Sequence, residues 1–575
     1  MHRRLRRALA PVSFALVSLA LMLPATARAD TVVGPGGGTP GTSSNVTLVG
    51  HAPLYNRGMN AALALYDHYA YVGNRTDGSS TCGAGDPRGP GATCPHPHPG
   101  VQIVDVADSA HPTVVGEIGP PYEGNVGITS RELRVWPQQK LLVVMNFRCS
   151  SVIHACAKGT DATFPYDFKF YDLTDPVHPR YLSRYVPTSR AGKTYKPHEM
   201  FLWVDPKDAN RALLYITTPN LTTDPTVPNL IIADLSQVPA GGAVSEVAEG
   251  NWNGRYPGTD SADYPFKKDG SCGPYNCNLF VHSVGLTPDG TRAYLSMEAG
   301  EFLVLDTSQV AAGTPNPSLT LQTDPANRPT WDNPNGHSAV QVYGRPLALT
   351  TDEVYGTFTA PDQGCPWGWM RLINVADVAH PTIVGAYKLP QDACPAPDVA
   401  TEQFTSYSSH NPTVLRDLAF IAWHSGGLQA IDLADETHPT QAGWFSPTPL
   451  DTVATEDPAL GGGPNKVIMW SYPIIRDGLI YVVDIRNGLY ILRYTGPRAD
   501  EVQAITFLEG NSNLGDAATL AAGAGTGPGA GGGTATPELG SGELLATGLV
   551  PLAVILLYRR RGRRRTRWQG DDTVA

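Results

Sequence analysis

The stretch that decides the fold is VQIVDVADSAHPTVVGEI, at residues 101–118. An apolar run ends at Asp105, a second acid follows at Asp108, and a His-Pro pair leads into another apolar run. Nothing in this pattern is typical of a catalytic motif, so its repetition has to be explained by the fold. Closely similar patterns occur at residues 168–185, 370–387 and 428–445.

Seven apolar runs in the sequence carry a polar residue at their fifth position. Those polar residues are Asp105, Asp172, Asp234, Asp306, Asn374, Asp432 and Arg493. Successive members stand 67, 62, 72, 68, 58 and 61 residues apart. Self-similarity at such a period, with four strand-like runs in each period, is the signature of a β-propeller. The sequence therefore predicts an all-β fold, a seven-bladed β-propeller over residues 45–510.

The short acids and the proline of the pattern fit the turn between the third and fourth strands of a blade. Asx side chains bond nearby backbone N–H groups in turns, and proline is tolerated at the start of an edge strand. We therefore interpret Asp105, Asp108, His111 and their copies as turn residues. The segment NVTLVGHAPL, at 45–54, resembles the fourth strands in sequence although it precedes the first blade. We expect it to pair with Leu489–Tyr494 in the last blade and to close the ring.

The runs VQIVDVADSAHP, MRLINVADVAHP and LQAIDLADETHP resemble LVIVD repeats, which form bladed β-propellers in exported bacterial proteins. The resemblance covers residues 45–495 and implies the fold. It implies little about activity, because that repeat family has no single established activity. The third and fourth blades depart from the motif and carry SQVPAGG and SQVAAGT in place of Asp-x-x-His-Pro.

Both ends of the chain predict export to the cell surface. Residues 1–29 join early arginines, an apolar segment and an A-x-A site, which is typical of a signal peptide; a first transmembrane helix is the alternative. Residues 541–567 join an apolar run to seven arginines and resemble a C-terminal sorting or transmembrane segment without a clean LPxTG. The arginines place residues 568–575 in the cytoplasm unless the tail is processed. Residues 30–44 and 511–540, rich in glycine, are expected to be a flexible linker and a Gly/Ala-rich stalk.

The net charge of the exported body excludes one class of partner. Without residues 1–29 and 544–575, the body has 30 basic and 51 acidic side chains, a net charge near −21. A nucleic-acid partner requires the opposite sign. Cation binding, or simple solubility, fits this charge.

Eight cysteines in an exported chain predict four disulfides. We pair them in sequence order, which places every staple on loops of the same face as the histidines described next. Stapled loops on a rigid scaffold can form a recognition surface, although long exported loops also need staples for stability alone. The predicted pairs are Cys82–Cys94, Cys149–Cys156, Cys272–Cys277 and Cys365–Cys394.

Histidines open the innermost strands of four consecutive blades: His198, His282, His337 and His410. Arg131 and Trp470 take the corresponding place in neighbouring blades. Polar residues that follow the second strands are Glu298, Asp352, Glu353, His424 and Asp484. All should converge on one mouth of the central channel. Imidazole with carboxylate suits Zn, Cu, Fe or Mn and also general acid–base work.

Two functions follow from these patterns. The first is a surface-anchored binding or scaffold module, whose partner is an extracellular protein, a glycan or a small molecule. The alternative is a metal-dependent extracellular enzyme, oxidase- or lactonase-like, with a divalent transition metal among His198, His282, His337, His410, Glu353 and His424. Hydrogen bonding to water and to adjacent strands is the structural interpretation of the same histidines. The sequence favours the binding module and does not specify its ligand.

Overall fold

The computed structural model describes residues 31–34, 37–76, 92–93, 95–119, 128–148, 166–219, 226–252, 281–297, 301–329, 331, 336–354, 367–393, 405–458 and 460–523. The predicted signal peptide, Glu298, all eight cysteines and the predicted anchor at 541–567 lie outside these ranges. In the described part of the chain, no helix is both long and apolar enough to cross a membrane.

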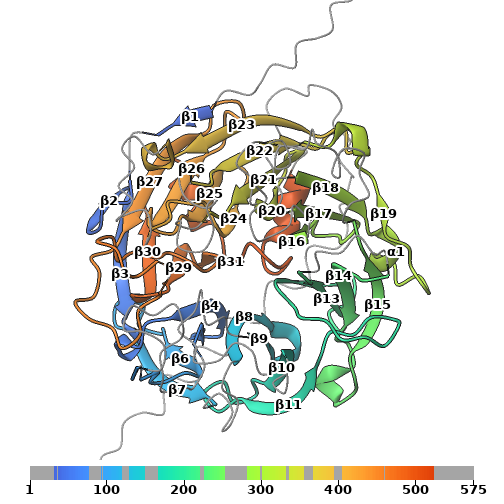
Figure 1. The fold of residues 1–575 in the computed structure, drawn as a ribbon, viewed down its shortest axis with the longest axis horizontal. Coiled ribbons are helices and arrows are strands. Elements are labelled where there is room, and N and C mark those ends of the chain that lie inside the picture. The colour runs from blue at the N-terminus through green and yellow to red at the C-terminus, as the bar shows by residue number, and fades with distance from the viewer. Residues whose placement is uncertain are drawn as a thin grey trace, which may run out of the picture. The chain divides into compact units, whose positions relative to one another are not determined.

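The described chain is built mostly of strands, which form antiparallel units of four (Figure 1). The first two units belong to one eight-stranded sheet, in which a single pair, Asn74 and Ser130, joins them. Their strands are β4 (Asn60–Tyr66), β5 (Tyr69–Asn74), β6 (Val101–Asp105) and β7 (Thr113–Ile118), then β8 (Ile128–Trp136), β9 (Leu141–Arg148), β10 (Asp167–Asp172) and β11 (Arg180–Tyr185).

The units that follow form separate sheets. The first two contain β12 (Met200–Val204), β13 (Ala212–Thr217), β14 (Leu230–Asp234) and β15 (Ser245–Gly250), then β16 (Val281–Leu286), β17 (Arg292–Met297), β18 (Glu301–Asp306) and β19 (Thr320–Leu321). The next two contain β20 (Gly336–Val342), β21 (Leu347–Asp352), β22 (Met370–Asn374) and β23 (Thr382–Lys388), then β24 (Pro412–Val414), β25 (Leu418–Ala422), β26 (Leu428–Asp432) and β27 (Thr440–Ser446). The last contains β28 (Ile474–Arg476), β29 (Leu479–Asp484) and β30 (Gly488–Tyr494). The short helix α1 (Ser308–Ala311) follows β18.

Strands from the N-terminal end complete three of these sheets. Strand β3 (Val46–Ala52) pairs antiparallel with β30, with Val46 opposite Tyr494, which confirms the predicted closing strand. Strand β1 (Thr31–Val33) pairs with β23 and β2 (Thr42–Ser44) pairs with β27. These two strands lie within the predicted flexible linker at 30–44, so that part of the prediction is corrected. Pairing covers the edges of β23 and β27, which would otherwise expose unpaired backbone groups.

The innermost strands follow one another around a common axis (Figure 1). Strand β4 contacts β8, β8 contacts β12, and the series continues through β16, β20 and β24. Thr413 of β24 donates from Oγ1 to the Pro473 carbonyl beside β28 at 2.5 Å, and β28 contacts β4. The described sheets therefore form a closed, propeller-like ring.

The sequence repeat reappears in the strand pairing. Between the third and fourth strands of five units, the register shifts by one residue at the same point of the motif: after Ile103, Phe170, Ile232, Leu372 and Ala430. The predicted turn chemistry is also confirmed, because Asp105 Oδ1 accepts from Ala107 N at 2.9 Å and Asp108 Oδ1 accepts from Ala110 N at 3.0 Å.

The hydrophobic core lies between neighbouring units. Phe201, Trp203 and Tyr215 of one unit, for example, belong to the same buried cluster as Leu286 and Leu303 of the next. Third strands such as β6 are buried on both faces except at their last residue. Fourth strands such as β7 alternate in exposure. Continuous apolar runs are expected where both faces of a strand are covered.

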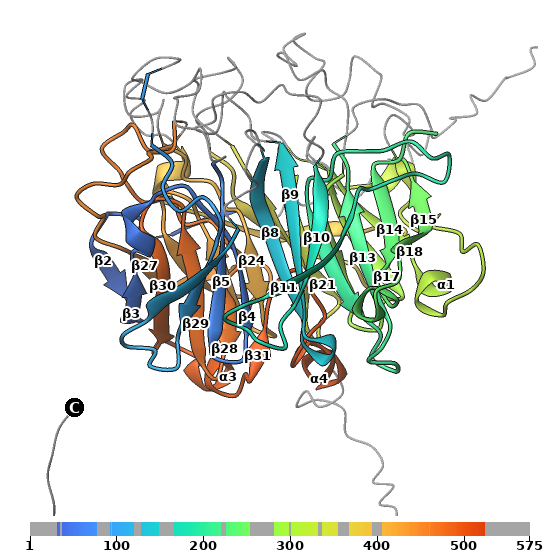
Figure 2. The ribbon, with the colours of Figure 1, turned by 90° about the horizontal axis from the view of Figure 1, so that it is seen from below.

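The C-terminal segment departs from the predicted boundary at residue 510. After α3 (Ala499–Gln503), strand β31 (Phe507–Leu508) pairs with the last residues of β28 on its inner side. The chain then reaches β12, where Leu202 N donates to Asn511 O at 3.2 Å and Val204 N donates to Asn513 Oδ1 at 2.8 Å. Residues 511–513 are buried by these bonds, and α4 (Ala517–Ala522) follows, so the predicted stalk cannot begin at 511. Figure 2 shows α3, β31 and α4 gathered at one end of the strands.

Candidate metal centre

Irregular pairing of the inner strands positions two of the predicted histidines. Val281 lies opposite Met297 and Ser283 opposite Ser296, so His282 is an extra residue in β16. In β20 the register shifts likewise between Gly336 and Ala339, around His337. A bulge of this kind re-aims side chains and is common beside functional sites.

The other two inner-strand histidines stand just before their strands. His198 N donates to Thr217 O at 2.8 Å, and His410 N donates to Ala422 O at 2.9 Å. Each histidine is thereby held opposite the end of the second strand of its own unit. The position is the same as that of His282 and His337 in their units.

The structure brings these four histidines and His424 into one continuous series, which we call the histidine file. Nε2 of His198 and Nε2 of His282 lie 2.8 Å apart. Ring centroids are 4.0 Å apart for His282 and His337, 4.0 Å for His337 and His410, and 4.7 Å for His410 and His424. The convergence that the register predicts is present, and metal binding by these residues stays a prediction.

Glu353 lies at the centre of one part of the histidine file. One of its carboxylate oxygens is 3.6 Å from His337 Nε2, and the other is 3.4 Å from Nε2 of both His410 and His424. Glu353 follows β21 directly, and His424 follows β25 after one residue. The backbone of His424 has φ of 35°, in a region that non-glycine residues seldom occupy and that is often associated with functional sites.

Two atoms at this point have no hydrogen-bond partner among the described residues: Nε2 of His410 and Oε1 of Glu353. The side chain of His410 is only 1% exposed and that of Glu353 12%. Their separation of 3.4 Å exceeds the usual 2.7–3.2 Å of an N–H···O hydrogen bond. A buried carboxylate oxygen without a partner is costly.

Nδ1 atoms of four of the five histidines in the file have partners that orient the rings. His410 Nδ1 bonds the Trp470 carbonyl at 2.9 Å, and because only an N–H can donate to a carbonyl, Nε2 carries the lone pair in the neutral ring. Serine hydroxyls bond Nδ1 of three more rings: Ser283 on His282 and Ser338 on His337 at 2.9 Å, and Ser406 on His424 at 3.0 Å. Partners of this type are a regular feature of metal-binding histidines.

Burial controls the protonation of the four inner-strand histidines. It lowers the pKa of His198, His337 and His410 well below the ordinary 6.5, and that of His282 to about 4. Burial alone would raise the pKa of Glu353, but the adjacent imidazoles hold that pKa well below its ordinary value. Neutral imidazoles beside an ionised carboxylate are the forms that bind a metal ion.

A second layer of polar side chains follows the file along the inner strands, and it contains the residue that the sequence reasoning missed. Ligand atoms of Glu199, His282 and His337 lie within 4.8 Å of one another. Glu199 comes directly after His198 in the sequence, and this adjacency is the signal that could have identified it as a member of the site. Burial and the neighbouring Glu132 raise the pKa of Glu199 well above its ordinary value.

A tryptophan and two arginines lie beside the end of the histidine file. Trp470 packs on the rings of His410 and His424, at centroid distances of 4.0 Å and 5.1 Å. Arg75 and Arg131 lie over the same indole, with Cζ 3.9 Å and 5.9 Å from its centroid. The centre therefore has an imidazole side and a guanidinium–indole side.

Asp352 and Asp484 are grouped with the histidines by the sequence, but both have structural roles. Asp352 accepts from Trp331 Nε1 at 3.0 Å and pairs with Arg371. Asp484 accepts from the backbone N–H of Ile468 at 2.7 Å and of Arg486 at 2.9 Å, which makes it a loop-fixing residue.

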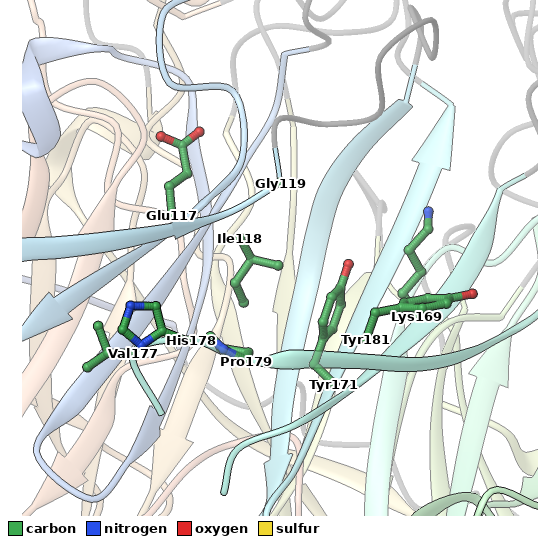
Figure 3. Close-up of a pocket in the computed structure, with 9 residues that line it drawn as sticks. All are labelled: Glu117, Ile118, Gly119, Lys169, Tyr171, Val177, His178, Pro179 and Tyr181. Atoms are coloured by element: carbon green, nitrogen blue, oxygen red, sulfur yellow. The ribbon is translucent and has the colours of Figure 1, made fainter. Parts of the chain in front are cut away.

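A separate open pocket of 510 Å³ lies along β7, β10 and β11 (Figure 3). Tyr171, Tyr181 and Lys169 are among its lining residues, together with the turn residue His178. It shares no residue with the histidine file.

No protein-family model matches the chain, and no curated protein matches it. Among solved structures, it is similar to the periplasmic gluconolactonase PpgL of Pseudomonas aeruginosa, with 12% identity, 72% of this chain and 96% of that chain covered, and a TM-score of 0.38. It is also similar to Sqt1 of Chaetomium thermophilum, with 11% identity, coverage of 77% and 85%, and a TM-score of 0.37. The all-β, propeller-like fold is shown by the sheet pairing above.

Proposed function

We propose that this protein binds one divalent transition metal ion through His337, His410, His424 and Glu353. The single observation that supports the proposal is the spacing of the ligand atoms. Ligands bonded at 2.0–2.1 Å to a tetrahedral ion are separated from one another by about 3.4 Å. The carboxylate oxygens of Glu353 stand 3.4, 3.4 and 3.6 Å from the three Nε2 atoms.

The interpretation without a metal explains the site less well. Hydrogen-bonded imidazoles would bring Nε2 to within about 3.2 Å of an acceptor. His410 Nε2 and Glu353 Oε1 have no such partner among the described residues. A cation that both atoms coordinate removes this cost, and a set of three nitrogens and one carboxylate suits Zn, Fe, Mn or Cu.

The activity that fits such a centre is metal-dependent chemistry outside the cytoplasm, of an oxidase or lactonase type. A metal ion in this position would polarise an oxygen of a bound substrate or activate a water molecule. The binding module that the sequence favours would depend on the stapled loops, whose cysteines lie outside the described residues. The buried polar cluster supports the enzyme in preference to that module.

The same proposal includes the finer features of the fold. The seven sequence periods, the recurring register shift and the closing strand β3 support a seven-bladed ring of the LVIVD type. Export by residues 1–29, four disulfides and a C-terminal anchor at 541–567 are the remaining parts, and the composition of the two ends supports them.

Metal titration tests the proposal directly. The full-length protein is stripped with a chelator and titrated with Zn²⁺ and with Co²⁺, whose absorption spectrum reports a nitrogen–oxygen ligand set. We expect one tightly bound ion, and binding weaker by about 100-fold or more in the Glu353→Gln variant. Glu436→Gln, which removes a carboxylate from an outer turn, is the matched control. A wild-type protein without bound metal, or a Glu353→Gln variant that binds like wild type, contradicts the proposal.

A further inference from the structure

Two N-terminal strands of this chain pair with the outer edges of its own sheets at equivalent positions. Strand β1 pairs with residues 386–388 of β23, and β2 pairs with residues 444–446 of β27. Each triplet begins directly after the glycine that follows the register shift of its unit, Gly385 in β23 and Gly443 in β27. The fold therefore has one edge position at which it accepts an added strand.

The hydrogen bonds of these added strands are also equivalent. The N–H of Gly34, which follows β1, donates to the carbonyl of Lys388 at 3.0 Å. The N–H of Gly41, which precedes β2, donates to the carbonyl of Ser446 at the same distance. Lys388 and Ser446 are the third residues of their triplets, so this carbonyl faces outward from the sheet edge in both units. An added strand uses it whether it runs parallel, as β1 does, or antiparallel, as β2 does.

The first unit has the same edge without an added strand in the described part of the chain. Its fourth strand, β7, is the last strand of its sheet, and Gly116 takes the place of Gly385 in its register. The equivalent triplet is therefore residues 117–119. All three of its residues line the open pocket of 510 Å³ (Figure 3). The position that β1 and β2 fill in two other units thus borders a pocket in this one.

The other side of this pocket belongs to the second unit and is mainly apolar. The residues that line it there include Val177, Pro179 and Tyr181. Tyr181 is 49% exposed. The carboxylate and the ammonium of the lining are held within the chain, because Glu117 accepts from Gly100 N at 2.8 Å and Lys169 donates to Asp167 at 3.1 Å. An occupant is therefore recognised by its backbone and by apolar contacts.

We propose that this pocket binds an extended, uncharged peptide segment of a partner protein, which adds a strand to β7 at residues 117–119. Strand addition is a common mode of peptide recognition, in which backbone hydrogen bonds give affinity and side-chain pockets give specificity. The sequences of β1 and β2, TVV and TSS, show the chemistry that this edge position accepts: short, uncharged and β-branched or hydroxylated. An apolar side chain of the added strand packs against Tyr181. The proposal does not depend on the metal centre.

Peptide titration of the full-length protein, with fluorescence anisotropy as the readout, tests the proposal. The probe is a labelled peptide with the sequence of residues 31–38, TVVGPGGG. We expect Tyr181→Ala to weaken its binding by about fivefold or more, because the ring is the exposed part of the apolar side. Tyr55→Ala is the matched control, since Tyr55 is 57% exposed and does not line the pocket.

Two further measurements identify strand addition and its place. A peptide with an N-methyl group on its first glycine lacks the donor that Gly34 offers to Lys388, and it should bind weaker by about fivefold or more. Hydrogen–deuterium exchange, followed by mass spectrometry, should become slower over residues 113–119 when the unmodified peptide is bound.

The outcomes separate strand addition from other forms of binding. A wild-type protein that binds no peptide, or a Tyr181→Ala variant that binds like wild type, overturns the proposal. Equal binding of the N-methylated peptide means recognition by side chains alone and overturns strand addition. Slower exchange at β23 or β27 in place of residues 113–119 means replacement of β1 or β2 and also overturns it. If the wild type dimerises in sedimentation and Tyr181→Ala does not, the occupant is a second copy of this chain, which overturns a partner protein as the occupant.

Discussion

Two sets of four histidines in this chain have opposite environments. In the outer turns, His111, His178, His380 and His438 are 53–81% exposed, and each has Nδ1 within 2.8–3.4 Å of the aspartate three residues before it. In the inner positions, His198, His282, His337 and His410 are largely or fully buried, and their rings contact one another.

The difference shows that position in the repeat, and not residue type, decides what a histidine does. In the turn, the hydrogen bond to Asp377 raises the pKa of His380, which favours the protonated ring. In the file, burial lowers the pKa of His282 to about 4, which favours the neutral ring with a free lone pair. Of these two histidines only His282 has the protonation that a metal ion requires, and only the inner set has rings crowded together.

The largest expected effect is loss of metal from the inner set alone. A His337→Gln/His410→Gln variant should bind Zn²⁺ weaker by at least about 100-fold, because two of the four proposed ligands are removed. His380→Gln/His438→Gln is the matched control from the same two units and should bind like wild type. Elemental analysis after gel filtration measures the content, and far-ultraviolet circular dichroism checks the fold.

Equal metal content in the two double variants would break the comparison between the sets. Loss of metal from the turn variant alone would indicate that the metal site lies in the outer turns.

Much of this comparison could be predicted from the sequence, because it depends on strand register. The period of the repeat separates residues that open an inner strand from residues that follow a third strand. The sequence predicts on that ground that His198, His282, His337 and His410 lie together, and the structure brings them together.

The remaining details depend on contacts that no local pattern contains. Asp352 and Glu353 are adjacent, and neighbouring residues at a strand end point to different sides. Only the fold shows that Asp352 turns to Trp331 while Glu353 turns to the imidazoles. The C-terminal segment was missed because Asn511 and Asn513 bond a strand some 300 residues earlier, through interactions that leave no periodic signal.

The second effect concerns pH and the metal-free protein. The pKa of His282 is near 4 in the folded chain and about 6.5 when unfolded, so the unfolded chain binds the extra proton between these values. Stability is then complete above pH 6.5, declines as the pH falls toward 4, and is lower by about 2 kcal/mol at pH 5.

Urea unfolding at pH 7 and pH 5 measures this term. His282→Gln should lose less stability than wild type over that interval, by about the stated amount. His380 has a raised pKa and contributes in the opposite sense, with stability lost as the pH rises, so His380→Gln should keep the acid loss. An equal acid loss in His282→Gln and wild type would show that burial of His282 does not control the effect.

A smaller effect is expected from the groups that hold the rings. Ser338 Oγ bonds Nδ1 of His337 at 2.9 Å, and Asp377 Oδ2 bonds Nδ1 of His380 at 2.8 Å. Ser338→Ala should weaken Zn²⁺ binding by about tenfold, as expected when the partner of a ligand histidine is removed. Asp377→Asn should leave it unchanged. Similar Zn²⁺ affinity in both variants would indicate that His337 is not a metal ligand.

The smallest effect is expected within the turns themselves, and it isolates what the turn aspartates do. Asp175 Oδ1 accepts from Val177 N at 3.1 Å and from His178 N at 3.3 Å, while Oδ2 bonds His178 Nδ1 at 3.1 Å. Asp175→Asn keeps the Oδ1 acceptor and should leave the melting temperature unchanged, because an exposed ion pair contributes little. Asp175→Ala removes the acceptor and should lower the melting temperature slightly, since the turn then loses its side-chain bond to the backbone. Differential scanning calorimetry at low and high salt compares the two variants. A larger loss for Asp175→Asn, reduced at high salt, would mean that the charge of the Asp–His pair stabilises this motif more than the hydrogen bonds of the turn do.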